Sequence, residues 1–420
     1  MIKLLVSHTT GNENTRNIIY GLYDKKLLHS FVVSIAVYKE SLYYVISCFK
    51  PFSFLKKRVF PYVLKNYIVT FPFKEIGRQI SVRLKLKSFV YFEDSFFSPY
   101  SESSYIDKKA SKYLERNSKD IDAVYCFEDI ALKTLIMAKK LHKFAIYDLP
   151  TGHWRYLRVL LDNEKNTNPD WVSSISGFKD SARKLANKDK EIELSDVIFV
   201  ASTFTKKSLS LYPGKLPPVY VVPYGFPHVN DSRNYSLTEG KKIKLLYVGK
   251  LTQAKGLSYL FDSVKGLDEF YELTVVGAGD IDECYALKKA LSTCNYIPPM
   301  HHDDILKLMS ESDILVFPSL FDGFGLVVTE AMSQGTPVIT TERTCGPDII
   351  TDGEDGWIVK AADSFAIRNL LEKLKYNKAE IIRVGKNARE TARKRPWSVY
   401  HKEVVNAIIE SYNLYGDATY

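Results

Sequence analysis

The stretch LLYVGKLTQAKGL, at residues 245–257, has the form of a buried strand, a loop with glycine at each end, and the start of a helix. Gly249 permits a tight turn after the strand, and the loop that follows it carries Lys250 and Lys255. A helix that opens at Gly256 presents unpaired N–H groups and the positive end of its dipole. The stretch therefore predicts a site for a diphosphate. The alternative is an ordinary loop with surface lysines, and the spacing is not that of a Walker loop.

A second stretch of the same form, FPSLFDGFGLVVTEAMSQGTPVI, occupies residues 317–339. Its loop contains Asp322 and two glycines, and backbone N–H groups around residues 324–326 are expected to face an anion. A carboxylate at this point can accept hydrogen bonds from sugar hydroxyls. Glu330 lies about two turns into the following helix, among apolar residues, where a carboxylate needs a partner. A binding role is the interpretation we favour for it.

Apolar strand patterns such as residues 31–37 alternate with amphipathic helical patterns along the whole chain. This alternation predicts α/β structure with doubly wound parallel sheets. A turn-rich and polar zone from 223 to 242 interrupts it. We predict two Rossmann-like domains, at 1–223 and 224–397, and a last helix at 398–420 that packs back onto the first. Ligands bind such folds at the carboxyl ends of the strands.

Charge is unevenly distributed over the 420 residues. Residues 1–225 carry 35 Lys and Arg against 22 Asp and Glu, whereas the rest of the chain carries 23 against 27. Residues 50–90 hold ten basic residues, one acid (Glu75) and interleaved aromatic residues. This pattern favours contact with an anionic membrane surface. A solvated basic face is the plain alternative, and nucleic acid is the least favoured partner.

Several patterns argue against other classes of protein. The five cysteines are scattered without a C-x-x-C pair, which is typical of a reducing cytoplasm and predicts no metal framework. The chain starts directly with a strand pattern, so we expect no signal peptide, and it has no run of about 18 apolar residues. Residues 277–282 hold an incomplete dinucleotide fingerprint and a D-x-D pattern that is better explained as a helix cap.

The carboxyl-terminal half resembles glycosyltransferase family 4, the retaining enzymes of the GT-B fold. The family hallmark, E-G-F-G-L-x-x-x-E followed by A-x-x-x-G-x-P-V-I, is matched by Asp322, Gly323, Phe324, Gly325, Leu326, Glu330, Ala331, Gly335, Pro337, Val338 and Ile339. The family's G-[RK]-L…K-G donor loop is matched by Gly249, Lys250, Leu251, Lys255 and Gly256. The motifs span about 110 residues, and residues 346–356 resemble a later family segment. Asp322 departs from the Glu that is usual there.

The resemblance implies a nucleotide-sugar donor in the carboxyl-terminal domain. It assigns the donor diphosphate to Lys250 and Lys255, the ribose to Glu330 and the base to residues 297–301. Asp322 would contact the donor sugar. The sugar and the phosphate would also be contacted by the N–H groups of Gly323, Phe324, Gly325 and Leu326. It implies no metal and no cofactor, because lysines and a helix dipole already stabilise the leaving group.

The amino-terminal half matches the family less closely. Gly11 and Asn12 follow the first strand where the family has a glycine-rich loop, so we expect donor or acceptor contacts, the alternative being an ordinary turn. Many members carry His-Asp at the end of a later strand, and here Tyr147 precedes Asp148. We expect either Asp148 or His153 to orient or deprotonate the acceptor hydroxyl. Their alternative roles are a turn cap and a surface histidine.

Together these patterns predict a cytoplasmic, metal-independent, retaining hexosyltransferase. Its acceptor would be a glycan or lipid-linked glycan in bacterial surface polysaccharide synthesis, reached on the inner face of the membrane. A nicotinamide-dependent dehydrogenase is disfavoured because the full glycine fingerprint is absent. The alternative that stays open is a non-catalytic protein that binds nucleotide-sugar or an anionic polymer.

Overall fold

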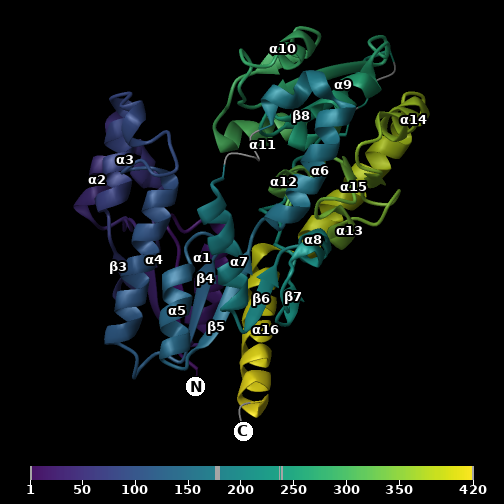
Figure 1. The fold of residues 1–420 in the computed structure, drawn as a ribbon. Coiled ribbons are helices and arrows are strands. Elements are labelled where there is room, and N and C mark those ends of the chain that lie inside the picture. The colour runs from purple at the N-terminus through teal and green to yellow at the C-terminus, as the bar shows by residue number, and fades with distance from the viewer. Residues whose placement is uncertain (1, 176–179, 236, 238–239, 419–420) are drawn as a thin grey trace.

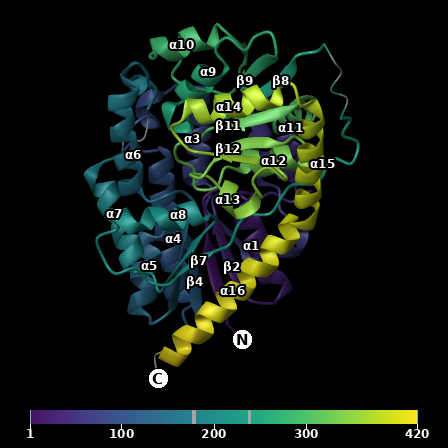
Figure 2. The same ribbon diagram turned by 90° about the vertical axis from the view of Figure 1, so that its right-hand side faces the viewer.

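The chain forms two parallel β-sheets, each covered by helices (Figures 1 and 2). A computed structural model describes residues 2–175, 180–235, 237 and 240–418. The first sheet has the order β3-β2-β1-β4-β5-β6-β7 and the second the order β10-β9-β8-β11-β12-β13, with neighbouring strands parallel throughout. The two doubly wound sheets that the alternation predicted are confirmed.

The strands of the first sheet are β1 (Leu4–Ser7), β2 (Leu28–Val33), β3 (Ile68–Thr70), β4 (Ala123–Phe127), β5 (Phe144–Leu149), β6 (Val197–Val200) and β7 (Val219–Val221). Those of the second are β8 (Ile243–Val248), β9 (Tyr271–Val276), β10 (Asn295–Ile297), β11 (Ile314–Phe317), β12 (Val338–Thr341) and β13 (Trp357–Val359). The central strands β1, β4, β5, β6, β11 and β12 are buried along their whole length, as expected for strands with helices on both faces.

The helices of the first half are α1 (Glu13–Asp24), α2 (Leu42–Ser47), α3 (Phe73–Arg83), α4 (Pro99–Arg116), α5 (Leu132–Lys140), α6 (Trp154–Thr167), α7 (Ala182–Glu193) and α8 (Thr203–Ser208). Those of the second half are α9 (Leu257–Val264), α10 (Tyr285–Leu291), α11 (His302–Glu311), α12 (Leu326–Ser333), α13 (Gly346–Ile349), α14 (Ser364–Leu374), α15 (Lys378–Lys394) and α16 (Trp397–Ala418). Short 3-10 turns are η1 (Lys50–Arg58), η2 (Tyr62–Tyr67), η3 (Lys87–Phe89), η4 (Pro169–Ser174), η5 (Leu209–Leu211) and η6 (Gln253–Lys255).

The last helix, α16, returns from the second domain to the first, as Figure 2 shows. It lies against α1, where a Cβ on Gly21 would come within 2.7 Å of the carbonyl oxygen of His401. Near its other end, the rings of Phe144 and Tyr412 are 5.5 Å apart. Residues 419–420 of the helix predicted at 398–420 lie outside the described residues. The close approach at Gly21 fixes where the two helices cross.

A second segment, α6 with η4, reaches from the first half of the chain to the second domain. It belongs by sequence to the first half, yet Glu164 of α6 accepts a hydrogen bond from the hydroxyl of Tyr259 on α9 of the second domain. The ring of Trp171 stacks on that of Phe261, with centroids 6.2 Å apart. The thiol of Cys284 donates a long hydrogen bond to the carbonyl of Asp170 at 3.6 Å. The range predicted as the first domain, 1–223, therefore contains a segment that packs on the second.

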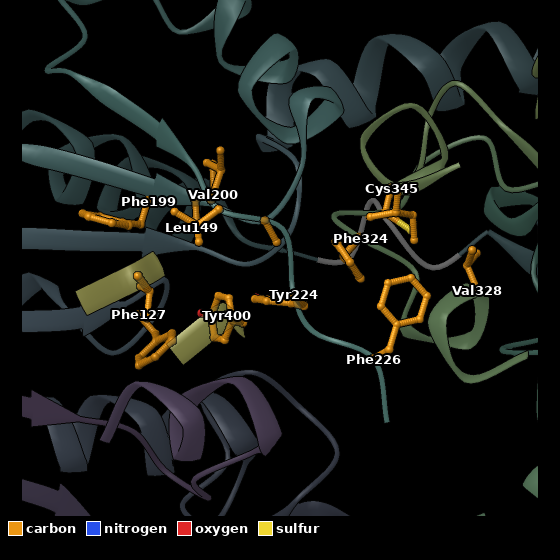
Figure 3. Close-up of a cluster of buried hydrophobic side chains, with 14 of the residues drawn as sticks. Phe127, Leu149, Phe199, Val200, Tyr224, Phe226, Phe324, Val328, Cys345 and Tyr400 are labelled. Carbon is orange, nitrogen blue, oxygen red and sulfur yellow. The ribbon is translucent and has the colours of Figure 1, made fainter. Parts of the chain in front are cut away.

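A buried aromatic cluster joins the two domains at the linker (Figure 3). Tyr224, in the connection between β7 and β8, lies 4.8 Å from the ring of Phe324 and 5.3 Å from that of Tyr400. Its hydroxyl accepts a hydrogen bond from Asn14 Nδ2 at 3.1 Å. These contacts tie the linker at once to α1, to α16 and to the loop before α12. The start of this connection, around Tyr224, is therefore packed rather than free.

Candidate functional site

The first predicted donor loop, residues 249–256, lies against the end of β9. The N–H of Gly249 donates to Val276 and that of Leu251 to Ala278, at 3.0 and 2.8 Å. A Cβ on Gly277 would lie 1.8 Å from the Gly249 carbonyl oxygen, and one on Gly279 2.3 Å from that of Leu251. Only glycine fits at such distances. Gly277 and Gly279, which the sequence presents as an incomplete dinucleotide fingerprint, thus shape the donor loop.

A pocket of about 590 Å³ opens at this point. It is lined by Gly249 and Lys250, by residues 277–280, and by Pro299, Met300 and Ile305. The structure therefore brings Lys250 together with part of the loop 297–301, which the family resemblance assigned to the base. The volume lies within the range of about 300–1,000 Å³ that is usual for small-molecule sites.

Lys255 and Asp322 come from different loops and meet in an ion pair. Lys255 Nζ lies 2.5 Å from Asp322 Oδ2 and donates to the carbonyl of Phe321 at 3.3 Å. Gly256, with φ 74°, sits so close to the residue that follows β11 that a Cβ would lie 2.0 Å from the Pro318 carbonyl oxygen. The left-handed turn at Gly256 therefore holds the first loop beside the second. As a result, the ammonium group of Lys255 and the carboxylate of Asp322 lie next to each other.

The second loop leads into α12 through Gly325, which has the left-handed φ of 88°. The N–H of Phe324 donates to Asp322 Oδ1 at 3.3 Å, and the carbonyl of Phe324 accepts from Cys345 N at 2.8 Å. Leu326 is the first residue of the helix and its side chain is exposed. The first turn of α12 thus follows the Asp322 loop directly. The unpaired N–H groups of this turn can therefore donate hydrogen bonds to an anion bound at the loop.

Glu330 lies on α12 with 21% of its side chain exposed. Burial raises the pKa of its carboxyl, and the nearby His302 opposes that rise. His302 Nδ1 lies 3.8 Å from Glu330 Oε1, and α11 begins at this histidine, just after the pocket residues Pro299 and Met300. The carboxylate therefore stands near the pocket, with a histidine as its neighbour that the sequence did not indicate.

The backbone of Gly11 is already committed within its own turn. Its N–H donates to His8 Nδ1 at 2.9 Å and its carbonyl accepts from Arg16 Nε at 2.7 Å. Burial, with Arg58 adding to it, lowers the pKa of His8 to about 3, so the ring is neutral and Nδ1 is free to accept. Asn12 caps α1 by accepting from Thr15 N at 3.2 Å. In this conformation Gly11 shapes the turn, and a donor contact would have to come from its Cα or its neighbours.

Asp148 lies at the carboxyl end of β5 with only 4% of its surface exposed. Its Oδ2 accepts a hydrogen bond from the hydroxyl of Tyr125 at 2.6 Å. Burial raises the pKa of this carboxyl to about 7, although the hydrogen bond from Tyr125 opposes the rise. The carboxyl therefore titrates near neutral pH, which suits a group that exchanges a proton.

His153 belongs to the same connection but has different surroundings. Its ring is buried, with Nε2 3.3 Å from Asp189 Oδ1, and Arg155 and Trp154 bind the same carboxylate. Burial lowers the pKa of the ring to about 4, against the influence of Asp189. The structure does not bring His153 and Asp148 to one point. Glu128, the residue after β4, is paired with Lys188 at 3.1 Å.

The Asp322 loop is held by groups of the first domain that the sequence did not single out. The hydroxyls of Ser202 and Thr205 donate to the carbonyl of Gly323 at 2.6 and 2.8 Å. A Cβ on Gly323 would lie 2.1 Å from the carbonyl oxygen of Pro150. Asp348 accepts from Thr203 N at 3.0 Å. The connection after β5 and the start of α8 therefore meet the loop predicted to hold the donor sugar. The role of these first-domain residues in holding the Asp322 loop follows only from which residues lie next to them in space.

Within the described residues, no group of three or more His, Cys, Asp and Glu side chains is arranged to hold a metal ion. No helix in that part of the chain combines the length and the apolar character needed to cross a membrane.

Two Rossmann-like domains, with paired glycine loops and lysines at the carboxyl ends of the strands of the second sheet, form the two-domain architecture of the GT-B fold. Residues 229–391 match the family described as glycosyl transferases group 1, which makes this part of the chain similar to a glycosyltransferase.

Relatives with described roles match parts of the chain. Similarity to the capsular polysaccharide biosynthesis glycosyltransferase CapM of Staphylococcus aureus is 25% identity over 262 residues, 58% of this chain and 68% of CapM. The amylovoran biosynthesis glycosyltransferase AmsK of Erwinia amylovora is 28% identical over 162 residues, 35% of this chain and 39% of AmsK. The chain thus spans two thirds of CapM but well under half of AmsK.

Two solved structures share the fold over nearly the whole chain. Anabaena HepE in complex with UDP and glucose has a TM-score of 0.61 at 14% identity, over 98% of this chain and all of that one. The sucrose-phosphate synthase of Thermosynechococcus elongatus has a TM-score of 0.64 at 14% identity, over 99% of this chain and all of that one. At such identity the likeness concerns the fold alone.

Proposed function

We propose that the chain transfers a hexose from a nucleotide-diphosphate sugar to a glycan or lipid-linked glycan, with retention of configuration. The observation that carries the proposal is the meeting of Lys255 with Asp322, at 2.5 Å, on two loops of the group 1 domain. One loop begins beside a pocket of about 590 Å³, and the other opens a helix. A diphosphate and a sugar are the two chemical parts that such neighbours would bind.

In this proposal Lys250 and Lys255 carry the diphosphate, and Glu330 binds the ribose. When the donor arrives, its phosphates offer Lys255 a second anionic partner and leave Asp322 able to accept sugar hydroxyls. The ammonium groups and the N–H groups of the first turn of α12 would stabilise the charge that develops on the leaving diphosphate. We propose that this positive charge takes the place of a metal ion.

The chemical step follows from the family resemblance. The bond between the anomeric carbon and the diphosphate breaks, and the acceptor oxygen bonds to the same face of that carbon. The acceptor's proton passes to the departing phosphate. Asp148, whose pKa is raised to about 7, is the residue we favour for orienting the acceptor hydroxyl, and His153 is the second candidate.

The acceptor proposal is supported by the names of the relatives and by the surface. CapM and AmsK are described as polysaccharide biosynthesis enzymes, and residues 50–90 combine basic and exposed aromatic side chains. We propose surface polysaccharide synthesis, at the cytoplasmic face of an anionic membrane that this segment touches.

The test is thermal denaturation with UDP, GDP, ADP and dTDP and their sugars, without added metal. One nucleotide at a hundredfold excess over its Kd should stabilise the protein by about 2.7 kcal/mol. Lys255→Ala should abolish this shift. The control, Lys373→Ala, removes an exposed lysine of α14 and should leave it intact. A protein that no nucleotide stabilises would overturn the donor site. Stabilisation without any sugar transfer or nucleotide release would indicate the non-catalytic binder.

A further inference from the structure

An apolar groove of about 360 Å³ lies on the first domain, away from the donor pocket. It runs between η1 and α3, beyond the carboxyl ends of β2 and β3. Its walls include Ile35, Val37, Phe52, Leu55, Ile76 and Ile80, and its lining is mostly apolar. A groove of this composition fits a hydrocarbon chain far better than a sugar.

The surroundings of the groove are apolar as well. Of the large hydrophobic side chains that are exposed among the described residues, most lie between positions 42 and 96. On α3, Phe73 is 55% exposed and Ile80 51%. A second apolar hollow, of about 680 Å³, lies along the other side of α3 and shares Ile76 and Ile80 with the first. Apolar surface on this scale marks a binding face in a soluble domain.

Basic side chains lie in the wall of the groove and on the 3-10 turn beside it. Arg83 lines it, with the guanidinium 5.1 Å from the ring of Phe54, and Lys56 and Lys57 stand exposed on η1. The one acid of residues 50–90, Glu75, is fully buried and is bound by Arg58 and Arg78. It therefore leaves the rim cationic. An apolar channel with a cationic rim complements a molecule with a hydrocarbon tail and an anionic head.

The groove also adjoins the loop after β1. Its wall residue Val37 pairs with Val59, and the carbonyl of Val37 accepts from Phe60 N at 2.8 Å. Arg16 bonds to the carbonyls of both Val59 and Gly11, at 2.6 and 2.7 Å. One side of the groove is thus the outer side of the Gly11 turn, at the same sheet edge as Asp148. A molecule in the groove would have its head near the acceptor side of the proposed site.

We propose that this groove holds the hydrocarbon chain of a lipid-phosphate-linked acceptor, with the phosphate among the basic residues of the rim. The inference rests on the proposed glycosyl transfer and deepens it, because it names the acceptor class and the place where its lipid is bound. It differs from general membrane contact, since one chain occupies a defined cavity.

A short isoprenyl monophosphate, kept below its aggregation limit and without vesicles, provides the direct test by calorimetric titration. We expect it to bind at least about tenfold more tightly than the isoprenol or inorganic phosphate, because each of these lacks one half of the interaction. Ile80→Glu should weaken binding at least about tenfold by placing a charge in the groove. Ile80→Trp, which fills the groove without charge, should do the same. Phe365→Glu alters a more exposed apolar residue, 75% exposed on α14, and should leave binding unchanged.

Two results would overturn the inference: equal binding by both Ile80 variants and the wild type, or binding to anionic vesicles without binding of the monomeric lipid phosphate. The second result would make this face a membrane surface only. Nucleotide stabilisation measured on the same preparations separates the two proposals and reports whether each variant is folded. If nucleotide stabilises the protein and the lipid phosphate does not bind, the groove assignment fails and the donor site stands; the reverse result removes the donor site alone.

Discussion

Glu164 of α6 accepts a hydrogen bond at 2.9 Å from Gln253 Nε2, in the loop that carries Lys255. The same carboxylate accepts from the hydroxyl of Tyr259, and Ser174 of η4 accepts from Gln253 N at 2.9 Å. A segment of the first half of the sequence therefore holds the donor loop of the second domain in place through hydrogen bonds.

Glu164→Ala should weaken nucleotide binding without touching any group proposed to contact the nucleotide. The substitution leaves the buried hydroxyl of Tyr259 without its acceptor and leaves Gln253 Nε2 with Ser258 as its one remaining acceptor, which costs about 1–3 kcal/mol. We expect a lower melting temperature and a nucleotide Kd raised several-fold, measured by calorimetry. Asp162→Ala, an exposed position on the same helix, is the control and should change neither quantity. An unchanged Kd for Glu164→Ala would mean that the donor loop holds its shape alone.

Asp322→Asn should separate binding from turnover. Loss of the negative charge releases Lys255 from its ion pair, so nucleoside diphosphate should bind as tightly as before or more tightly. The weaker amide acceptor should lower kcat by about 10²-fold or more, if Asp322 binds the sugar most strongly in the transition state. Steady-state kinetics with a measured nucleotide Kd tests both effects. Asp322→Glu, which restores the residue usual in the resembling family, is the companion variant. A rise in KM alone would assign Asp322 to ground-state binding.

The sequence predicted the carboxyl-terminal loops well because each combines its glycines, its charged residue and its helix start within a short stretch. Local rules suffice there: Gly256 and Gly325 do adopt the left-handed backbone, and Lys255 and Asp322 lie where two strands end. The resemblance placed residues 297–301 near the base, and two of them line the pocket. Their roles toward a ligand stay predictions.

Relations between distant segments were beyond the same rules. The amphipathic pattern of α6 indicates that one face is buried but not that it packs on Tyr259 and Gln253. The strand predicted at residues 31–37 begins earlier and ends at Val33, because the N–H of Ser34 bonds to Thr9 and its hydroxyl to the buried Glu102. Gly277 lacked a complete motif, and only the 1.8 Å distance from a Cβ to the Gly249 oxygen explains it.

Gly277→Ala should therefore damage the donor pocket. The new methyl group cannot coexist with the Gly249 carbonyl, so the loop at Lys250 must move away from β9. We expect loss of nucleotide stabilisation in thermal denaturation and a destabilisation of about 1–3 kcal/mol, as for other overpacked sites. The control is Gly416→Ala, near the end of α16, where a Cβ meets nothing within 4 Å and the better helix former should be neutral or slightly stabilising. Normal nucleotide binding by Gly277→Ala would show that this loop does not shape the site.

Asp148→Asn gives a prediction about pH whose sign follows from burial. The pKa of this carboxyl rises from the ordinary 3.8 to about 7 in the folded protein, so the folded state binds the extra proton between those values. The free energy of unfolding should therefore fall as the pH rises from 4 to 7, by at most about 4 kcal/mol from this group. Asparagine keeps an acceptor for Tyr125 but has no charge to bury. Relative to the wild type, the variant should gain stability steadily between pH 4 and 8 in denaturant titrations.

If Asp148 also handles the acceptor proton, kcat should drop by about 10²–10⁴-fold in Asp148→Asn, and the wild-type rate should rise through pH 7. A variant with the predicted stability profile but normal turnover would leave Asp148 a structural residue and transfer the acceptor role to His153 or to the leaving phosphate alone.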